Sequence, residues 1–243
     1  MRRVWLVLAL IGMLSVSACS VMTIRTVRGS GDVVSEPRSV EGFSRVAISG
    51  IGTLYIEQGD REALVIEAED NILPYLESEV RNNTLELGVQ ITGLNLRPTE
   101  RIEYYLTVRD LEQVEASGTA DVYILSLTTS EFQIEISGLG DVTVDALFSD
   151  SVRTDISGSG DVRIAGEVAD QEVQISGLGN YDAGDLESDV ALIVMSGSAS
   201  ATVWAKESLD VRISGVGDVE YYGSPQVRQQ ISGLGSLLQL GDR

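Results

Sequence analysis

The chain alternates apolar and polar residues with a period of two over most of its length, as β-strands with one buried face do. In residues 131–136 (EFQIEI), the aromatic residue and the two isoleucines share one face, and the polar residues share the other. The alternation resumes at Val142 and Val144 after a glycine-rich corner. No segment between such corners carries a 3.6-residue apolar stripe of helical length, so the pattern predicts an all-β fold.

A Ser-Gly-x-Gly-Asp motif, or a close variant, marks these corners and recurs along the chain. The regular copies carry their Ser-Gly pairs at Ser117 and Gly118, Ser137 and Gly138, Ser157 and Gly158, Ser176 and Gly177, Ser196 and Gly197, Ser214 and Gly215, and Ser232 and Gly233. Successive serines are 20, 20, 19, 20, 18 and 18 residues apart. An earlier copy begins at Ser49, and the gap of 68 residues that follows leaves room for about three coils without the motif. Each copy predicts two short strands joined by a bend, where glycine permits positive φ.

Strands that recur about every 19 residues without helices can stack as the coils of a single-stranded parallel β-helix. We expect about ten coils of 18–20 residues in one domain over 38–243, irregular over 57–115 and regular over 116–240. Inward side chains would form a column with a spacing of about 4.8 Å. That column comprises Ile136, Ile156, Ile175, Met195, Ile213 and Ile231.

The N-terminus has the features of an export signal. Residues 1–18 combine Arg2 and Arg3 with a short apolar core, and Val16-Ser17-Ala18-Cys19 resembles the lipobox of bacterial lipoproteins. We therefore expect cleavage before Cys19, acylation of Cys19 with fatty acids such as palmitate, and a flexible tether over 19–37. The alternative is a plain cleaved signal peptide with a coincidental cysteine. The lipid predicts an extracytoplasmic envelope protein anchored in a membrane.

Composition removes several classes of mechanism. The chain has no histidine and one cysteine, which excludes His-dependent catalytic triads, His-ligated zinc and internal disulfides. Its formal net charge of −20 argues against nucleic acid as a partner. Loss of Arg2 and Arg3 with the signal leaves 15 basic and 37 acidic side chains, a net charge of −22. No cofactor is predicted.

An ordered series of residues at the start of the domain resembles a known family. The series includes Gly42-Phe43, Ile48-Ser49-Gly50, Tyr55-Ile56, Gln58-Gly59 and Leu73-Pro74-Tyr75-Leu76. Together with the repeated corners, it is similar to the bacterial "putative auto-transporter adhesin, head GIN domain" family over about residues 38–240. The resemblance implies a secreted or lipid-anchored envelope protein with a parallel β-helix, generally regarded as right-handed. It brings no catalytic residues with it.

Two sets of corner residues invite a chemical interpretation. Asp121, Asp141 and Asp161 would stack on consecutive coils, where they could bind Ca²⁺ or instead cap their own corners by accepting backbone N–H bonds. The mixture of Asp, Asn, Ser and Thr at this position favours capping. The motif serines lack a histidine base and are expected to form a hydroxyl ladder that satisfies backbone groups.

The outward positions of the second strand, among them Tyr55, Tyr123, Thr143 and Arg163, are mixed and indicate no aromatic platform for sugars. We therefore predict a non-enzymatic, lipid-anchored adhesin, scaffold or partner-binding protein. Its partner would be an envelope protein or a glycan, and unpaired edges of the terminal coils could support self-association. The alternative is a polysaccharide-binding or polysaccharide-active protein with its site in 57–115. A role in envelope stress or regulation is a third option.

Overall fold

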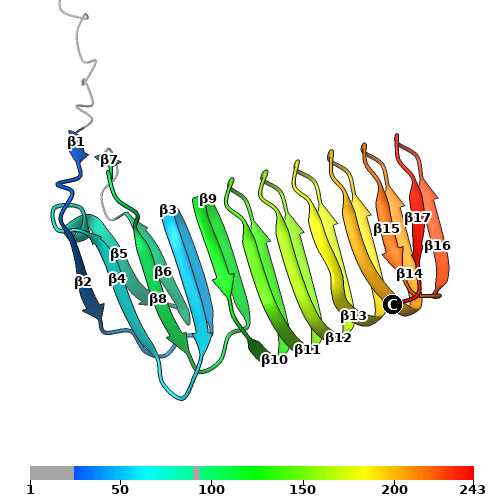
Figure 1. Cartoon of the computed structure of the whole chain (residues 1–243), viewed down its shortest axis with the longest axis horizontal. Helices are drawn as coiled ribbons and strands as arrows, with labels where there is room; N and C mark the ends of the chain where they lie inside the picture. The colour runs from blue at the N-terminus through cyan, green and yellow to red at the C-terminus, as the bar shows by residue number, and fades with distance from the viewer. Residues whose placement is uncertain (1–24, 90–93) are drawn as a thin grey trace, which may run out of the picture.

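The computed structural model describes residues 25–89 and 94–243 as an elongated, all-β molecule (Figure 1). About 70% of the chain lies in strands, and the one short helix in these residues is the 3₁₀ turn η1, Leu73–Tyr75. No helix in the described part of the chain is long and apolar enough to cross a membrane.

The regular half of the molecule is a stack of parallel strands, each hydrogen-bonded to the turn before it and, except in the last turn, to the turn after it. Ile136 pairs with Ile156, and Ile156 pairs with Ile175, so the sequence repeat is also the structural repeat. The strands are β9 (Gln113–Ile124), β10 (Leu127–Ile136), β11 (Val142–Ile156), β12 (Val162–Ile175), β13 (Tyr181–Met195), β14 (Ala201–Ile213), β15 (Val219–Tyr222), β16 (Gln226–Ile231) and β17 (Leu237–Gly241).

Strands in the middle of the stack are longer than the repeat predicts. β11 runs through a bend in the coil, and its pairing with β12 shifts register between Val144 and Leu147 instead of stopping there. The backbone hydrogen bonds between turns therefore continue around a side of the coil for which the period-two pattern predicts no strand. The motif corners form a row along one edge of the molecule (Figure 1).

The predicted column of inward residues forms the core. Ile136, Ile156, Ile175, Met195 and Ile213 are each at most 1% exposed. Ile231 in the last turn is the exception at 37%, because no further turn covers it in the structure. Burial of such side chains contributes about 1.5–3 kcal/mol each, and every turn depends on its neighbours for it.

The prediction of about ten coils is not confirmed, since the solenoid has about six turns. The reason lies at its N-terminal end. β3 (Arg45–Gln58) pairs directly with β9, Ser49 against Ser117, so the 67 residues between these serines insert no coils between the two motif copies. The right-handed sense implied by the family resemblance stays a prediction.

β2, which precedes β3, and the described residues between β3 and β9 form an N-terminal cap that contains antiparallel pairs. β2 pairs with β4, β4 with β8, and β5 with β6 in antiparallel fashion, while β6 and β8 run parallel to β3 on its outer side. The bounds are β2 (Val33–Arg38), β4 (Ala63–Glu69), β5 (Leu76–Arg81), β6 (Thr84–Val89) and β8 (Glu103–Val108).

The segment predicted as a flexible tether contains two strands within its described part. β1 (Arg25–Arg28) pairs with β7 (Leu94–Arg97), and β2 lies at the end of the sheet order. Both strands find their partners far along the chain, which is why the polar, Gly- and Ser-containing sequence gives no local sign of them.

Candidate functional site

Three tyrosines stack on the outer face of the solenoid at the junction between the cap and the regular turns. Tyr55 on β3 lies between Tyr105 on β8 and Tyr123 on β9. The ring centroids of Tyr55 and Tyr105 are 5.3 Å apart at 14°, and those of Tyr55 and Tyr123 are 5.6 Å apart at 20°. Tyr105 and Tyr123 remain 41% exposed. We call these residues the tyrosine ladder.

Strand alternation explains why the rings point outward. Leu54 and Ile56 flank Tyr55 and are buried in the core, so the residue between them must face solvent. Stacked aromatic pairs of this kind contribute about 0.5–1.5 kcal/mol beyond area burial. The ladder therefore stabilises the junction and also presents a rigid aromatic surface.

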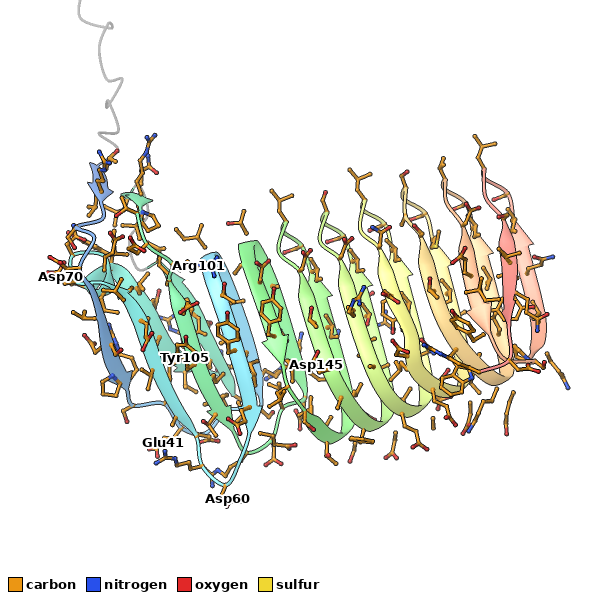
Figure 2. The ribbon with its side chains drawn as sticks, viewed as in Figure 1. Glu41, Asp60, Asp70, Arg101, Tyr105 and Asp145 are labelled. Atoms are coloured by element: carbon orange, nitrogen blue, oxygen red, sulfur yellow. The ribbon has the colours of Figure 1, made fainter. Side chains whose placement is uncertain are left out.

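A shallow groove of about 550 Å³ lies beside the tyrosine ladder. Its walls include Val65 and the 62%-exposed Leu125, and Tyr105 and Asp145 both line it (Figure 2). Arg61 and Glu57 provide charged groups. A mainly apolar groove with a few polar groups is typical of binding sites.

The phenol of Tyr105 is fixed by a carboxylate. Its hydroxyl donates a hydrogen bond of 2.9 Å to Glu103, and this bond, with burial as a smaller cause, raises the pKa of Tyr105 to about 12. The hydroxyl therefore stays protonated at physiological pH, and the ring is held in one orientation.

The tyrosine ladder corrects the expectation that no aromatic platform exists. The period-two pattern predicts that Tyr55 and Tyr123 face outward, but it separates them by lost coils and assigns no outward position to Tyr105. The alternation of Tyr104, which is buried, with Tyr105 was the only available signal. It did not reveal that β8 lies beside β3.

A larger groove of about 1630 Å³ runs over β10 to β13 and reaches residues of β3, β9 and β14. Eight acidic and three basic side chains line it, and Phe148 is an exposed aromatic residue there without a stacked neighbour among the described rings. Polar and charged groups make up a larger share of its lining than in the groove beside the tyrosine ladder.

The three aspartates proposed as calcium ligands form a ladder of backbone hydrogen bonds. Asp121 accepts the N–H of Asp141 at 3.0 Å, and Asp141 accepts the N–H of Asp161 at 2.8 Å. Asp161 accepts the N–H of Asn180 at 2.7 Å. Each side chain thus caps the corner of the next turn instead of its own. In the described residues, no group of three or more Asp, Glu, Cys or His side chains is arranged to hold a metal ion.

The Ser-Gly pairs also join successive turns. The hydroxyl of Ser117 donates to the carbonyl of Ile48 at 3.3 Å, and that of Ser157 donates to Ile136 at 3.3 Å. A Cβ on Gly177 would lie 1.8 Å from the carbonyl oxygen of Gly158. The other regular copies, Gly118, Gly138, Gly158, Gly197, Gly215 and Gly233, would bring a Cβ within 1.9–2.4 Å of the preceding turn. The geometry therefore gives the Ser-Gly pairs a structural role in the close stacking of successive turns.

Several acidic residues of the cap are engaged in internal contacts. The Glu69 carboxylate is 1% exposed and accepts bonds from the Gly31 N–H at 2.7 Å and the Thr99 N–H at 2.9 Å. Burial raises the pKa of Glu69, but the hydrogen bond from the Thr99 hydroxyl, together with these two backbone bonds, outweighs burial and lowers the pKa overall. Arg81 pairs with Glu77, Glu79 and Glu86. Cys19, the predicted lipidation site, lies outside the described residues.

Comparison with known proteins gives a family and a fold. A family model described as "Putative auto-transporter adhesin, head GIN domain" matches residues 42–225. A crystal structure of a putative adhesin from Bacteroides fragilis is 27% identical, with a TM-score of 0.85, and covers 88% of this chain and 100% of its own.

Two further solved structures share the fold at lower identity. A putative lipid binding protein from Parabacteroides distasonis is 21% identical, with a TM-score of 0.71, over 89% of this chain and 100% of its own. A putative adhesin from Parabacteroides merdae is 20% identical, with a TM-score of 0.66, over 89% of this chain and 99% of its own. Among curated proteins, none matches the chain.

Proposed function

Because this chain belongs to the family described as "Putative auto-transporter adhesin, head GIN domain", we propose that it is a non-enzymatic, adhesin-type protein of the cell envelope. We further propose that it binds its partner, an envelope protein or a glycan, through the groove beside the tyrosine ladder.

The observation that carries this proposal is the tyrosine ladder itself. Tyrosine is enriched at the energetic centres of interfaces, because it buries a large area at a low cost in conformational entropy. Tyr55 is held on both faces by its neighbours, so its ring is already ordered before binding. Apolar walls and a few charged groups around the ladder suit a partner of mixed character.

The alternative of a polysaccharide-active enzyme in 57–115 receives less support from the geometry. Glu69 is enclosed by hydrogen bonds to the backbone and to Thr99, and Glu103 accepts the Tyr105 hydroxyl. Glu67 accepts a bond of 2.7 Å from Ser35. Carboxylates held in this way are less available for general acid–base catalysis than a pair facing an open cleft.

Anchoring at the envelope is the second part of the proposal. It rests on the lipobox-like sequence that ends at Cys19, the one cysteine of the chain. We expect metabolic labelling with an alkyne fatty acid to tag the full chain, and a Cys19→Ser variant to lose both the label and membrane fractionation. A label that persists in the variant would contradict acylation at Cys19, and membrane retention without the label would contradict anchoring through that lipid.

The partner is sought with the residue 20–243 fragment on cell envelopes and on a glycan array, with Ca²⁺ present and absent. A Tyr105→Ala/Tyr123→Ala variant should lose at least about tenfold in affinity, which is about 1.4 kcal/mol. Phe148→Ala is the matched control, since Phe148 is 49% exposed and lies in the larger groove. Equal binding by all three proteins would refute the assignment of the groove.

A further inference from the structure

The last turn of the solenoid presents two strands with one edge free. β16 pairs with β14 and β17 pairs with β15, and no strand in the described residues pairs with their outer edges. Unpaired backbone N–H and C=O groups at such an edge are a template for another strand. An edge of this kind is usually paired, covered or blocked.

Core-facing side chains of this turn are correspondingly exposed. Val227 and Ile231 are 42% and 37% exposed, whereas Leu209 and Ile213, their counterparts one turn earlier, are each 1% exposed. Leu237 on β17 is half-buried, whereas Val219, its counterpart one turn earlier, is 0% exposed. The hydrophobic core is therefore exposed to solvent at this end of the stack.

The last turn also departs from the charge of the rest of the molecule. Residues 224–243 contain two arginines and one aspartate, in a chain with a net charge of −20. Like-charge repulsion opposes the approach of two such chains over most of their surface. That repulsion is weak at this end, where basic side chains outnumber acidic ones.

The opposite end of the stack is protected. Its outermost strand, β2, contains Pro37, which has no backbone N–H to donate, beside an ion pair of 2.7 Å between Arg38 and Glu36. Proline and charge on an edge strand oppose edge-to-edge pairing. A head-to-tail contact, which would propagate into filaments, is therefore disfavoured.

We propose that the last turn is an interface for a second copy of this chain, which joins it tail to tail in an isologous dimer. A two-fold axis makes the paired strands antiparallel, so β16 meets β16 of the second copy. In an antiparallel pair, the numbers of any two facing residues add up to the same sum. Inward side chains of one copy face inward side chains of the other only when that sum is even.

One such register centres the two-fold axis on Gln229. It places Val227 opposite Ile231 of the second copy, Gln229 opposite Gln229, and Arg228 opposite Gln230. No like charges face each other in this arrangement. Gln229 aligns with buried Val211 and is thus inward-facing, and two facing amides can hydrogen-bond to each other. A single polar pair in an apolar interface fixes register, as a buried asparagine does in coiled coils.

The test is the mass of the full chain in mild detergent, measured by sedimentation with the detergent density-matched. We expect a dimer, and at least about a tenfold weaker dimer for Val227→Lys. Val190→Lys is the matched control, because Val190 is 37% exposed on the flank of β13 and should leave the dimer unchanged. If the Val227→Lys variant still binds envelopes, the dimer interface and the groove beside the tyrosine ladder are independent sites.

Register is tested by oxidative cross-linking. Gln229→Cys should form a disulfide-linked dimer, since facing residues of antiparallel strands have Cα atoms about 4.5–5.5 Å apart. Arg228→Cys should cross-link far less, because it faces Gln230. The proposal would be overturned by a monomer at 100 μM or above or by open filaments. It would also be overturned by a dimer that tolerates Val227→Lys, or by equal cross-linking of both cysteine variants.

Discussion

Glu69 is a buried carboxylate that ties three separate segments of the cap together. It accepts hydrogen bonds from Gly31 and Thr99, which lie 38 and 30 residues away along the chain. Its side chain also occupies the space next to Gly29, where a Cβ would lie 1.9 Å from a carboxylate oxygen. The negative charge thus has a structural role at this position.

The lowered pKa of Glu69 predicts a pH dependence of stability. A carboxyl group whose folded pKa is below its unfolded value of about 4.5 stabilises the fold above that value, and this contribution is lost as pH falls through the folded pKa. Glu69→Gln should therefore cost about 1–3 kcal/mol at pH 7 and progressively less as the pH falls through the folded pKa. Urea unfolding between pH 3 and pH 7 measures the difference, with Glu67→Gln as the control. A deficit that is the same at every pH would contradict the account.

The sequence shows that glycine recurs at the corners, but it reveals only part of the physical reason why glycine is required there. The sequence predicts glycine for positive φ, and Gly118 does have φ +82°. Later first-position glycines such as Gly177 do not have positive φ, and they are required instead because the preceding turn leaves no room for a Cβ. That constraint comes from the stack and cannot be read from one turn.

At the scale of elements, the inward column makes each turn a support for the next. Ile156 contacts Ile136 and Ile175 through adjacent ladders and is 1% exposed. An aspartate at this position would be an unpaired charge in an apolar environment. The period-two pattern was sufficient to predict this column from the sequence.

Ile156→Asp should therefore destabilise the fold by several kcal/mol. Leu178→Asp, a change at a corner where the side chain is 65% exposed, should have little effect. The measurement is the urea midpoint of each variant at pH 7. A midpoint for Ile156→Asp equal to that of the unmodified chain would show that the column is not packed as described.

The N-terminal cap shows where sequence-based prediction of elements reached its limit. Individual strands such as β4 and β8 alternate clearly, but their antiparallel pairing joins residues about 40 apart, Leu64 with Leu106 for example. A spacing of 68 residues between two motif copies is compatible with intervening coils that have lost the motif. It is equally compatible with a segment that leaves the solenoid and returns to the adjacent turn. Only the long-range pairing of β3 with β9 distinguishes the two, and the tyrosine ladder depends on that pairing.

At the scale of the whole molecule, several cations are used to join neighbouring turns. Arg153 pairs with Glu172 at 2.7 Å, Arg163 with Asp182 at 2.9 Å and Lys206 with Glu187 at 2.7 Å. The remaining acidic excess gives a surface that repels anionic membranes and other copies of the chain. Contact with a partner is then favoured where apolar and aromatic groups are exposed, at the groove and at the last turn.

The central claim, that the tyrosine ladder contacts a partner at the envelope, is tested most directly by a labelling footprint. Intact cells carrying the full chain and the purified chain are treated with a tyrosine-selective diazonium reagent, and modification is measured by mass spectrometry. Tyr105 and Tyr123 should react in the purified chain and be protected on cells, while the half-buried Tyr221 and Tyr222 near the other end serve as internal references. Equal modification of Tyr105 and Tyr123 in both samples would contradict the claim.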